Sequence, residues 1–77
     1  MIERINILAH VPVNKAVKVE RIIAGPRARK YLADLGIFEG ETLKVLKNDF
    51  GPIVVEVKGT RVALGRGIAN KVEVREL

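Results

Sequence analysis

The chain has 77 residues, a formal net charge of +5 and no cysteine. This length predicts one domain, residues 1–77, with a core so small that every apolar position counts. Without cysteine the chain can form neither a disulfide nor a thiolate metal site, and small secreted scaffolds are usually rich in cysteine. Serine, glutamine and tryptophan are missing as well, whereas charged residues are abundant. A thermophilic source is therefore expected, because labile side chains are disfavoured at high temperature.

Neither a signal peptide nor a membrane span is predicted. Met1–Arg4 contains an acid and is not followed by an unbroken apolar stretch, as a signal peptide would be. The longest apolar run falls far short of the roughly 20 residues that cross a bilayer. We therefore expect a soluble cytoplasmic protein.

Apolar alternation predicts five short strands. Residues 16–23 form the first, with a bulge where the alternation slips at Ile22-Ile23. Residues 42–48, 53–58, 61–64 and 72–74 form the others, separated by turns at 49–52 and 58–60 and by a single helical turn at 65–70. Residues 5–12 are expected to be irregular or a short strand that Pro12 ends.

One helix is predicted between the first two of these strands. It begins at Gly25-Pro26, because proline suits the first helical position, and it ends at Gly36 as a left-handed cap. Four apolar residues share one face that should pack on the sheet: Ala28, Tyr31, Leu32 and Leu35. The fold predicted is mainly β, a small five-stranded barrel with one short inserted α-helix.

Catalysis and metal binding lack the residues they require. There is no serine or cysteine nucleophile, and His10 is the only histidine, so a catalytic triad cannot be built. A carboxylate pair drawn from Asp34, Glu39 and Glu41 remains conceivable, although these acids are expected in a solvated loop. Iron and zinc sites need clustered ligands. We expect no enzyme, no metal site and no cofactor. The glycines around Arg66 are interpreted as a tight turn and not as a phosphate loop.

Positive charge raises nucleic acid as a partner. The cations are dispersed, however, and the three aromatic residues, Tyr31, Phe38 and Phe50, do not alternate with them as a stacking surface requires.

Three cations crowd the start of the helix: Arg27, Arg29 and Lys30. They oppose the helix dipole there. Together with the helix N-terminus they attract anions, which indicates a docking spot for an acidic partner or a phosphate. The alternative is a solvated face on a basic protein.

These blocks resemble the FeoA family over residues 13–75. The resemblance rests on LADLGIFEG at 32–40, Gly51-Pro52, VKGTRVAL at 57–64 and Ala69 before the last strand. It implies an SH3-like domain that binds the cytoplasmic part of FeoB, a membrane ferrous-iron transporter with a GTP-binding domain. In iron- and manganese-dependent repressors the same fold is fused to a DNA-binding domain, for which this chain has no room.

The family pattern gives several residues a structural meaning. Gly36 resembles the helix cap, Gly40 the turn into the next strand, and Leu32 and Leu35 the helix leucines that meet the barrel. The pattern also includes Gly59, Ala63, Leu64 and Ala69. The chain departs from it at Asn14, Tyr31 and Gly65, where the family often has glycine, arginine and a basic residue; asparagine tolerates the same turn conformations as glycine.

The sequence therefore predicts a cytoplasmic accessory protein with a partner-binding surface of Arg27, Arg29, Lys30, Asp34 and Phe38. The alternative for Phe38 is that it packs beneath the barrel. Two other functions stay open: a nucleic-acid-binding SH3-like module, and a transition-metal-binding regulatory domain of the repressor type. The sequence does not decide whether the protein activates, inhibits or scaffolds the transporter, or whether it forms a homo-oligomer.

Overall fold

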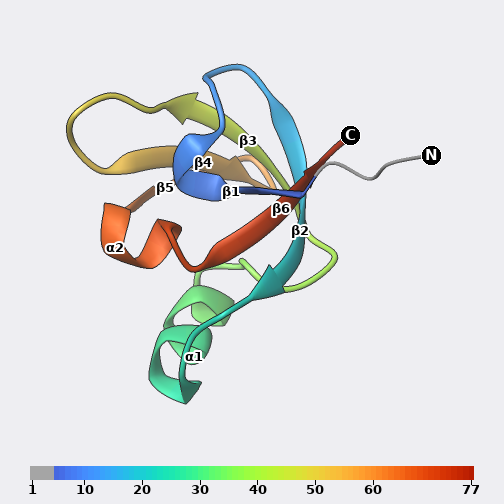
Figure 1. Cartoon of the computed structure of the whole chain (residues 1–77), viewed down its shortest axis with the longest axis vertical. Coiled ribbons are helices and arrows are strands. Elements are labelled where there is room, and N and C mark those ends of the chain that lie inside the picture. Colours follow the sequence, from blue (N-terminus) through green and yellow to red (C-terminus); the bar gives the residue numbers. More distant parts are fainter. Residues whose placement is uncertain (1–4) are drawn as a thin grey trace.

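Six antiparallel strands form one curved sheet, drawn in Figure 1 from the computed structural model, which describes residues 5–77. The strands are β1 (Ile5–Ile7), β2 (Ala16–Ile22), β3 (Thr42–Lys47), β4 (Ile53–Val57), β5 (Thr60–Leu64) and β6 (Val72–Glu76). A 3-10 helix, η1 (Leu8–His10), follows β1, and the α-helices are α1 (Pro26–Asp34) and α2 (Arg66–Ala69). Met1–Arg4, used above to argue against a signal peptide, lies outside the described residues.

The strand order is β1-β6-β2-β3-β4-β5, and the sheet curls into a small barrel whose edge strands do not pair with each other. The prediction of a mainly β fold with one inserted helix is confirmed. The sixth strand, β1, lies in the segment expected to be irregular or a short strand, and pairs with β6 between Ile5↔Arg75 and Ile7↔Glu73. Three residues are too few for an alternating pattern to show.

The bulge in β2 is present, but two residues before the predicted position. Val19 and Arg21 face consecutive residues of β6, so Glu20 is the extra residue. The bulge changes which positions face inward. Ile22 is therefore buried, and Ile23 is exposed where the chain leaves the strand. In the sequence, the alternation of apolar residues changes only at Ile22, which follows the bulge.

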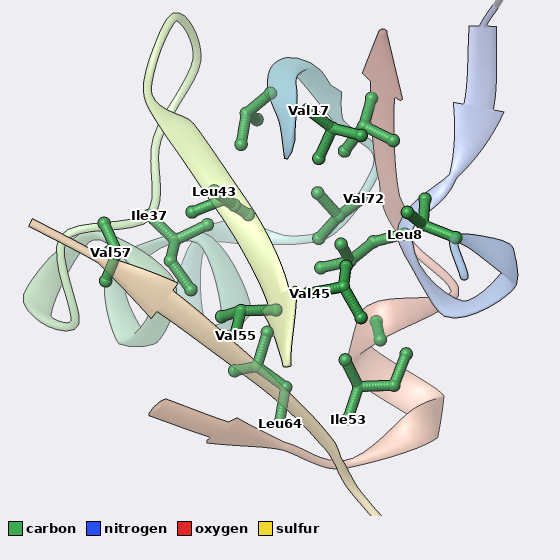
Figure 2. Packing of buried hydrophobic residues seen from close by; sticks show 14 of the residues in the cluster. Leu8, Val17, Ile37, Leu43, Val45, Ile53, Val55, Val57, Leu64 and Val72 are labelled. Atoms are coloured by element: carbon green, nitrogen blue, oxygen red, sulfur yellow. The ribbon is translucent and has the colours of Figure 1, made fainter. Parts of the chain in front are cut away.

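The core is entirely aliphatic. Among residues 5–77 no polar or charged side chain is buried, and the fully buried large side chains are leucine, isoleucine and valine. Side chains from facing strands meet in one interior (Figure 2), which extends from Ile37 and Val57 beside α1 to Leu8 and Ile53 beside η1 and α2. Burying these side chains is the main favourable contribution to folding.

Arg66 joins the two open ends of the sheet. Strand β1 leads into η1 and β5 leads into α2, and these two helices contact each other. From α2, Arg66 Nη1 donates to the carbonyl oxygens of Asp49 at 2.8 Å and Gly51 at 2.9 Å. Its Nη2 donates to Ala9 O of η1 at 3.3 Å and to Asn48 Oδ1 at 2.6 Å. One guanidinium thus connects α2, η1 and the β3–β4 loop.

Asn48 completes this arrangement. Its Nδ2 donates to Ala9 O at 3.1 Å and to Val11 O at 2.6 Å, while its Oδ1 accepts from Arg66. Carbonyls that have no ladder partner are satisfied in this way, as partly buried carbonyls must be.

Helix α1 ends in a Schellman motif. Gly36 N–H donates to Ala33 O at 2.9 Å and Ile37 N–H donates to Leu32 O at 2.8 Å. Gly36 has φ +91°, so the predicted left-handed cap is confirmed. Because Ile37 follows the cap and is fully buried, the chain returns from the helix directly into the core.

Tyr31 was predicted on the buried face of α1, and this is wrong. Leu32 is fully buried and Ala28 and Leu35 are half-buried, but Tyr31 is 50% exposed. Successive helical residues lie about 100° apart around the axis. The contact with the barrel is a narrow stripe centred on Leu32, and Tyr31 falls outside it.

We expect Gly36→Val to lower the free energy of unfolding by about 1–3 kcal/mol, because a β-branched residue is strained at positive φ. A Cβ at Gly36 would stand 3.7 Å from Val57 Cγ2, an ordinary contact, so the cost arises in the backbone. Thermal denaturation measures it, with Gly67→Val as the control in α2, where no atom lies within 4 Å. A melting temperature equal to that of the wild type would show the capping assignment to be wrong.

We expect Arg66→Met to destabilise the fold by about 2 kcal/mol, because it removes the donor from two partly buried oxygens, Gly51 O and Asn48 Oδ1. Arg66→Lys should restore only part of the loss, since one ammonium cannot reach four oxygens spread over η1 and the β3–β4 loop. Urea denaturation of both variants checks this, with exposed Arg61→Met as the control. A wild-type unfolding midpoint for Arg66→Met would contradict the role given to this side chain.

Candidate functional site

An open hollow of about 450 Å³ lies between α1, the end of β2 and the loop that follows α1. Its lining residues are Ile22, Arg29, Lys30, Ala33, Ile37, Phe38 and Glu39. The Schellman cap creates this hollow. It turns the chain so that Ile37 enters the core and Phe38 emerges beside the helix. The hollow therefore combines an apolar lining with charged side chains of both signs.

Phe38 does not pack beneath the barrel. Its side chain is 43% exposed, and Lys58 Nζ stands over the ring, 5.3 Å from the centroid. Lys58 Nζ also lies 3.6 Å from Glu41 Oε1. A cation over an aromatic face is attracted by the ring electrons. The β4–β5 turn thus holds the ring in place at the surface.

Arg29 fastens α1 to the barrel. Its Nη1 donates to Ile22 O at 2.7 Å, and its Nη2 lies 3.7 Å from Glu39 Oε2. The hydrogen bond from Arg29 Nη1 satisfies the carbonyl of Ile22 at the end of β2. Sequence reasoning assigned Arg29 only to partner binding and missed this structural role, because the carbonyl that it satisfies belongs to another element.

Some but not all of the predicted partner-binding residues line the hollow. Arg29, Lys30 and Phe38 line the hollow, and Asp34 lies beside it as the ion-pair partner of Lys30, at 3.1 Å. Arg27 does not line it. The pair of Lys30 with Asp34 is well exposed and therefore contributes little to stability.

The family-pattern residues take structural positions. Leu64 and Ala69 are fully buried, and Leu35 packs against the core.

Gly40 turns the loop into β3, and its N–H donates to Val19 O at 2.8 Å. Gly59 forms the tight β4–β5 turn with Lys58, both at positive φ. Ala63 faces outward on β5. Asn14, a departure from the pattern, adopts φ +70°.

The three aromatic side chains lie on three different elements. Tyr31 is on α1, Phe38 is in the loop after it, and Phe50 is in the β3–β4 loop. A single-stranded nucleic acid is usually bound by aromatic side chains that share one groove. The arrangement here therefore disfavours the nucleic-acid alternative.

Metal ligands do not gather in the part of the chain that the structure describes. No group of three or more histidine, cysteine, aspartate or glutamate side chains could hold an ion there. His10 is exposed in η1. A search of the same residues finds no helix with both the length and the apolar character needed to cross a membrane.

Comparisons with known proteins agree on one family. The FeoA domain model matches residues 7–76. The protein named "Putative Fe(2+) transport protein A" from Methanocaldococcus jannaschii is 39% identical over 69 residues, which cover 90% of this chain and 84% of that protein. A crystal structure of the iron uptake regulatory protein FeoA is 35% identical with a TM-score of 0.92, covering 96% of this chain and all of that one.

A manganese-dependent transcriptional repressor has the same fold within a longer chain. It is 28% identical with a TM-score of 0.89, and the match covers all of this chain but 44% of the repressor. These likenesses confirm the prediction of a small SH3-like barrel.

We expect the metal-free protein to bind ferrous iron, or zinc as its surrogate, only weakly, because one histidine and dispersed acids form no closed ligand set. Titration calorimetry on chelator-treated protein checks this. A stoichiometric site with micromolar affinity would contradict it and would favour a regulatory domain of the repressor type.

Proposed function

The chain belongs to the FeoA family, and from this premise we propose that it binds the cytoplasmic part of the FeoB ferrous-iron transporter. The FeoA family comprises accessory proteins of ferrous-iron transport. In this proposal the protein acts in the cytoplasm and docks through an α1 surface, defined as Arg29, Lys30, Asp34 and Phe38, with Arg27 at its margin.

Phe38 is the observation that carries this assignment. Its ring is about half exposed, lines a hollow and is held by Lys58. Aromatic side chains in such settings are frequent anchors of protein interfaces. An apolar side chain of the partner could enter the hollow beside Phe38, with polar groups meeting the charged rim. Interfaces of this kind have an apolar centre and a polar margin.

The charges on the α1 surface play two different roles. Arg29 is held by Ile22 O and Glu39, so it keeps the shape of the hollow. Lys30 and Asp34 form an exposed pair that a partner can separate at small cost. We assign to this pair the steering of association, since charges at an interface margin act mainly on the association rate.

We expect Phe38→Ala to weaken binding to the purified cytoplasmic domain of FeoB about tenfold or more, as removal of an interface anchor does. Tyr31→Ala is the matched control, because it removes an aromatic ring of similar exposure from outside the hollow. It should change the affinity less than about twofold, an effect typical of residues outside an interface centre. Titration calorimetry or surface plasmon resonance supplies the affinities.

Both variants should melt at temperatures near that of the wild type, since neither ring is in the core. Lys30→Glu should slow association at low salt, with a smaller effect at high salt. If Phe38→Ala binds like the wild type, the α1 surface is not the docking site. If the wild-type protein does not bind the FeoB domain, the proposed function itself fails.

A further inference from the structure

A second apolar surface lies away from α1, on the β3–β4 loop. Phe50 is at the tip of this loop and its side chain is fully exposed, at 102% of the reference area. In Figure 1 the loop, olive to gold, extends sideways from the upper part of the barrel, whereas α1 hangs below it. The α1 surface and Phe50 therefore face different surroundings.

The loop is held without any help from the phenyl ring. Arg66 donates to the carbonyl oxygens on both sides of Phe50, those of Asp49 at 2.8 Å and Gly51 at 2.9 Å. On the side of the loop these bonds use only backbone carbonyl oxygens, so a polar residue at position 50 would allow the same loop. Nothing in the hydrogen bonding of the loop requires an apolar ring at position 50, and the ring is fully exposed to whatever lies outside the chain.

A second loop, between η1 and β2, also exposes apolar side chains. The segment before β2 lies against the end of β3, because Asn14 N–H donates to Val45 O at 2.7 Å and Asn48 Nδ2 donates to Val11 O at 2.6 Å. It exposes Pro12 and Val13, the latter to 46%. We call Pro12, Val13 and Phe50 the loop end.

The charge beside the loop end is positive. Arg66 donates to three carbonyl oxygens and one amide oxygen, all neutral groups, so these bonds leave its charge uncompensated. Lys47 is exposed at the end of β3, and the acid Asp49 is exposed in the loop that follows it. The whole chain has a net charge of +5, which adds attraction toward an anionic surface.

We propose that the loop end inserts into the headgroup region of an anionic lipid surface, with Phe50 as its anchor. The headgroup region of a bilayer can surround such a projecting ring. Phenylalanine is among the side chains that enter this boundary from the apolar side of surface-bound segments, and nearby cations are attracted to anionic lipids. One ring and a few charges give weak, reversible binding. Because the loop end lies away from α1, this contact leaves the α1 surface accessible.

Tryptophan fluorescence provides a direct test. The chain contains no tryptophan, so Phe50→Trp creates a single reporter at the loop end and Tyr31→Trp creates a matched reporter on α1. With vesicles of phosphatidylcholine and phosphatidylglycerol, the emission of Phe50→Trp should move to shorter wavelengths, and added salt should reverse this. Vesicles of phosphatidylcholine alone should have little effect, and Tyr31→Trp should not respond.

Sedimentation with the same anionic vesicles measures affinity. Phe50→Ala should lower the partition coefficient about tenfold, because the burial of a phenyl ring is lost. Tyr31→Ala should leave it unchanged. The vesicles contain no transporter, so this result does not depend on docking to FeoB.

Three outcomes would overturn the lipid proposal. The first is no response of Phe50→Trp to anionic vesicles, and the second is an equal response of Tyr31→Trp. The third is a response of Phe50→Trp to the soluble FeoB domain but not to vesicles, which would assign the loop end to a protein contact.

Discussion

The shape of the barrel depends on how the two unpaired edges of its sheet are held near each other. An aliphatic core attracts its members without direction, so it favours compactness but selects one arrangement only through shape. Hydrogen bonds have direction. Arg66 and Asn48 fix η1, α2 and the β3–β4 loop relative to one another through carbonyl oxygens that no strand partner can reach. The strands supply most of the buried side chains, and these two residues connect the helices that follow the unpaired edge strands β1 and β5.

The small aliphatic core also explains what remains outside. The interior is filled by valine, leucine and isoleucine, and none of the three aromatic rings enters it. Helix α1 reaches the barrel through a narrow stripe around Leu32, together with the bond from Arg29 to Ile22 O. A helix attached so sparingly keeps most of its circumference exposed. Because the core of this short chain is small, most of α1 and the loop that follows it remain exposed and available to a partner.

Local patterns were sufficient for the parts of this fold that local physics determines. The alternation in β3 and β4, the cap at Gly36 and the tight turn at Gly59 could all be predicted, because each depends on neighbouring residues. Arg66 could not, since its acceptors lie 15 to 57 residues away, and the flanking glycines drew the interpretation toward a turn alone. Tyr31 failed for a related reason. Helical spacing identifies an apolar face, whereas its buried width depends on the surface beneath it.

The distribution of ion pairs separates the two proposed surfaces. Acids are engaged around the hollow, where Arg29 meets Glu39 and Lys30 meets Asp34, so charge there is close to balanced. Such a surface discriminates by shape and by the exchange of particular pairs, which suits one protein partner. At the loop end the guanidinium of Arg66 is bound to neutral oxygens and keeps its positive charge. Positive charge beside a projecting ring is attracted to a negatively charged surface. An anionic lipid interface provides that charge and can also surround the ring, without the fixed shape of a protein pocket.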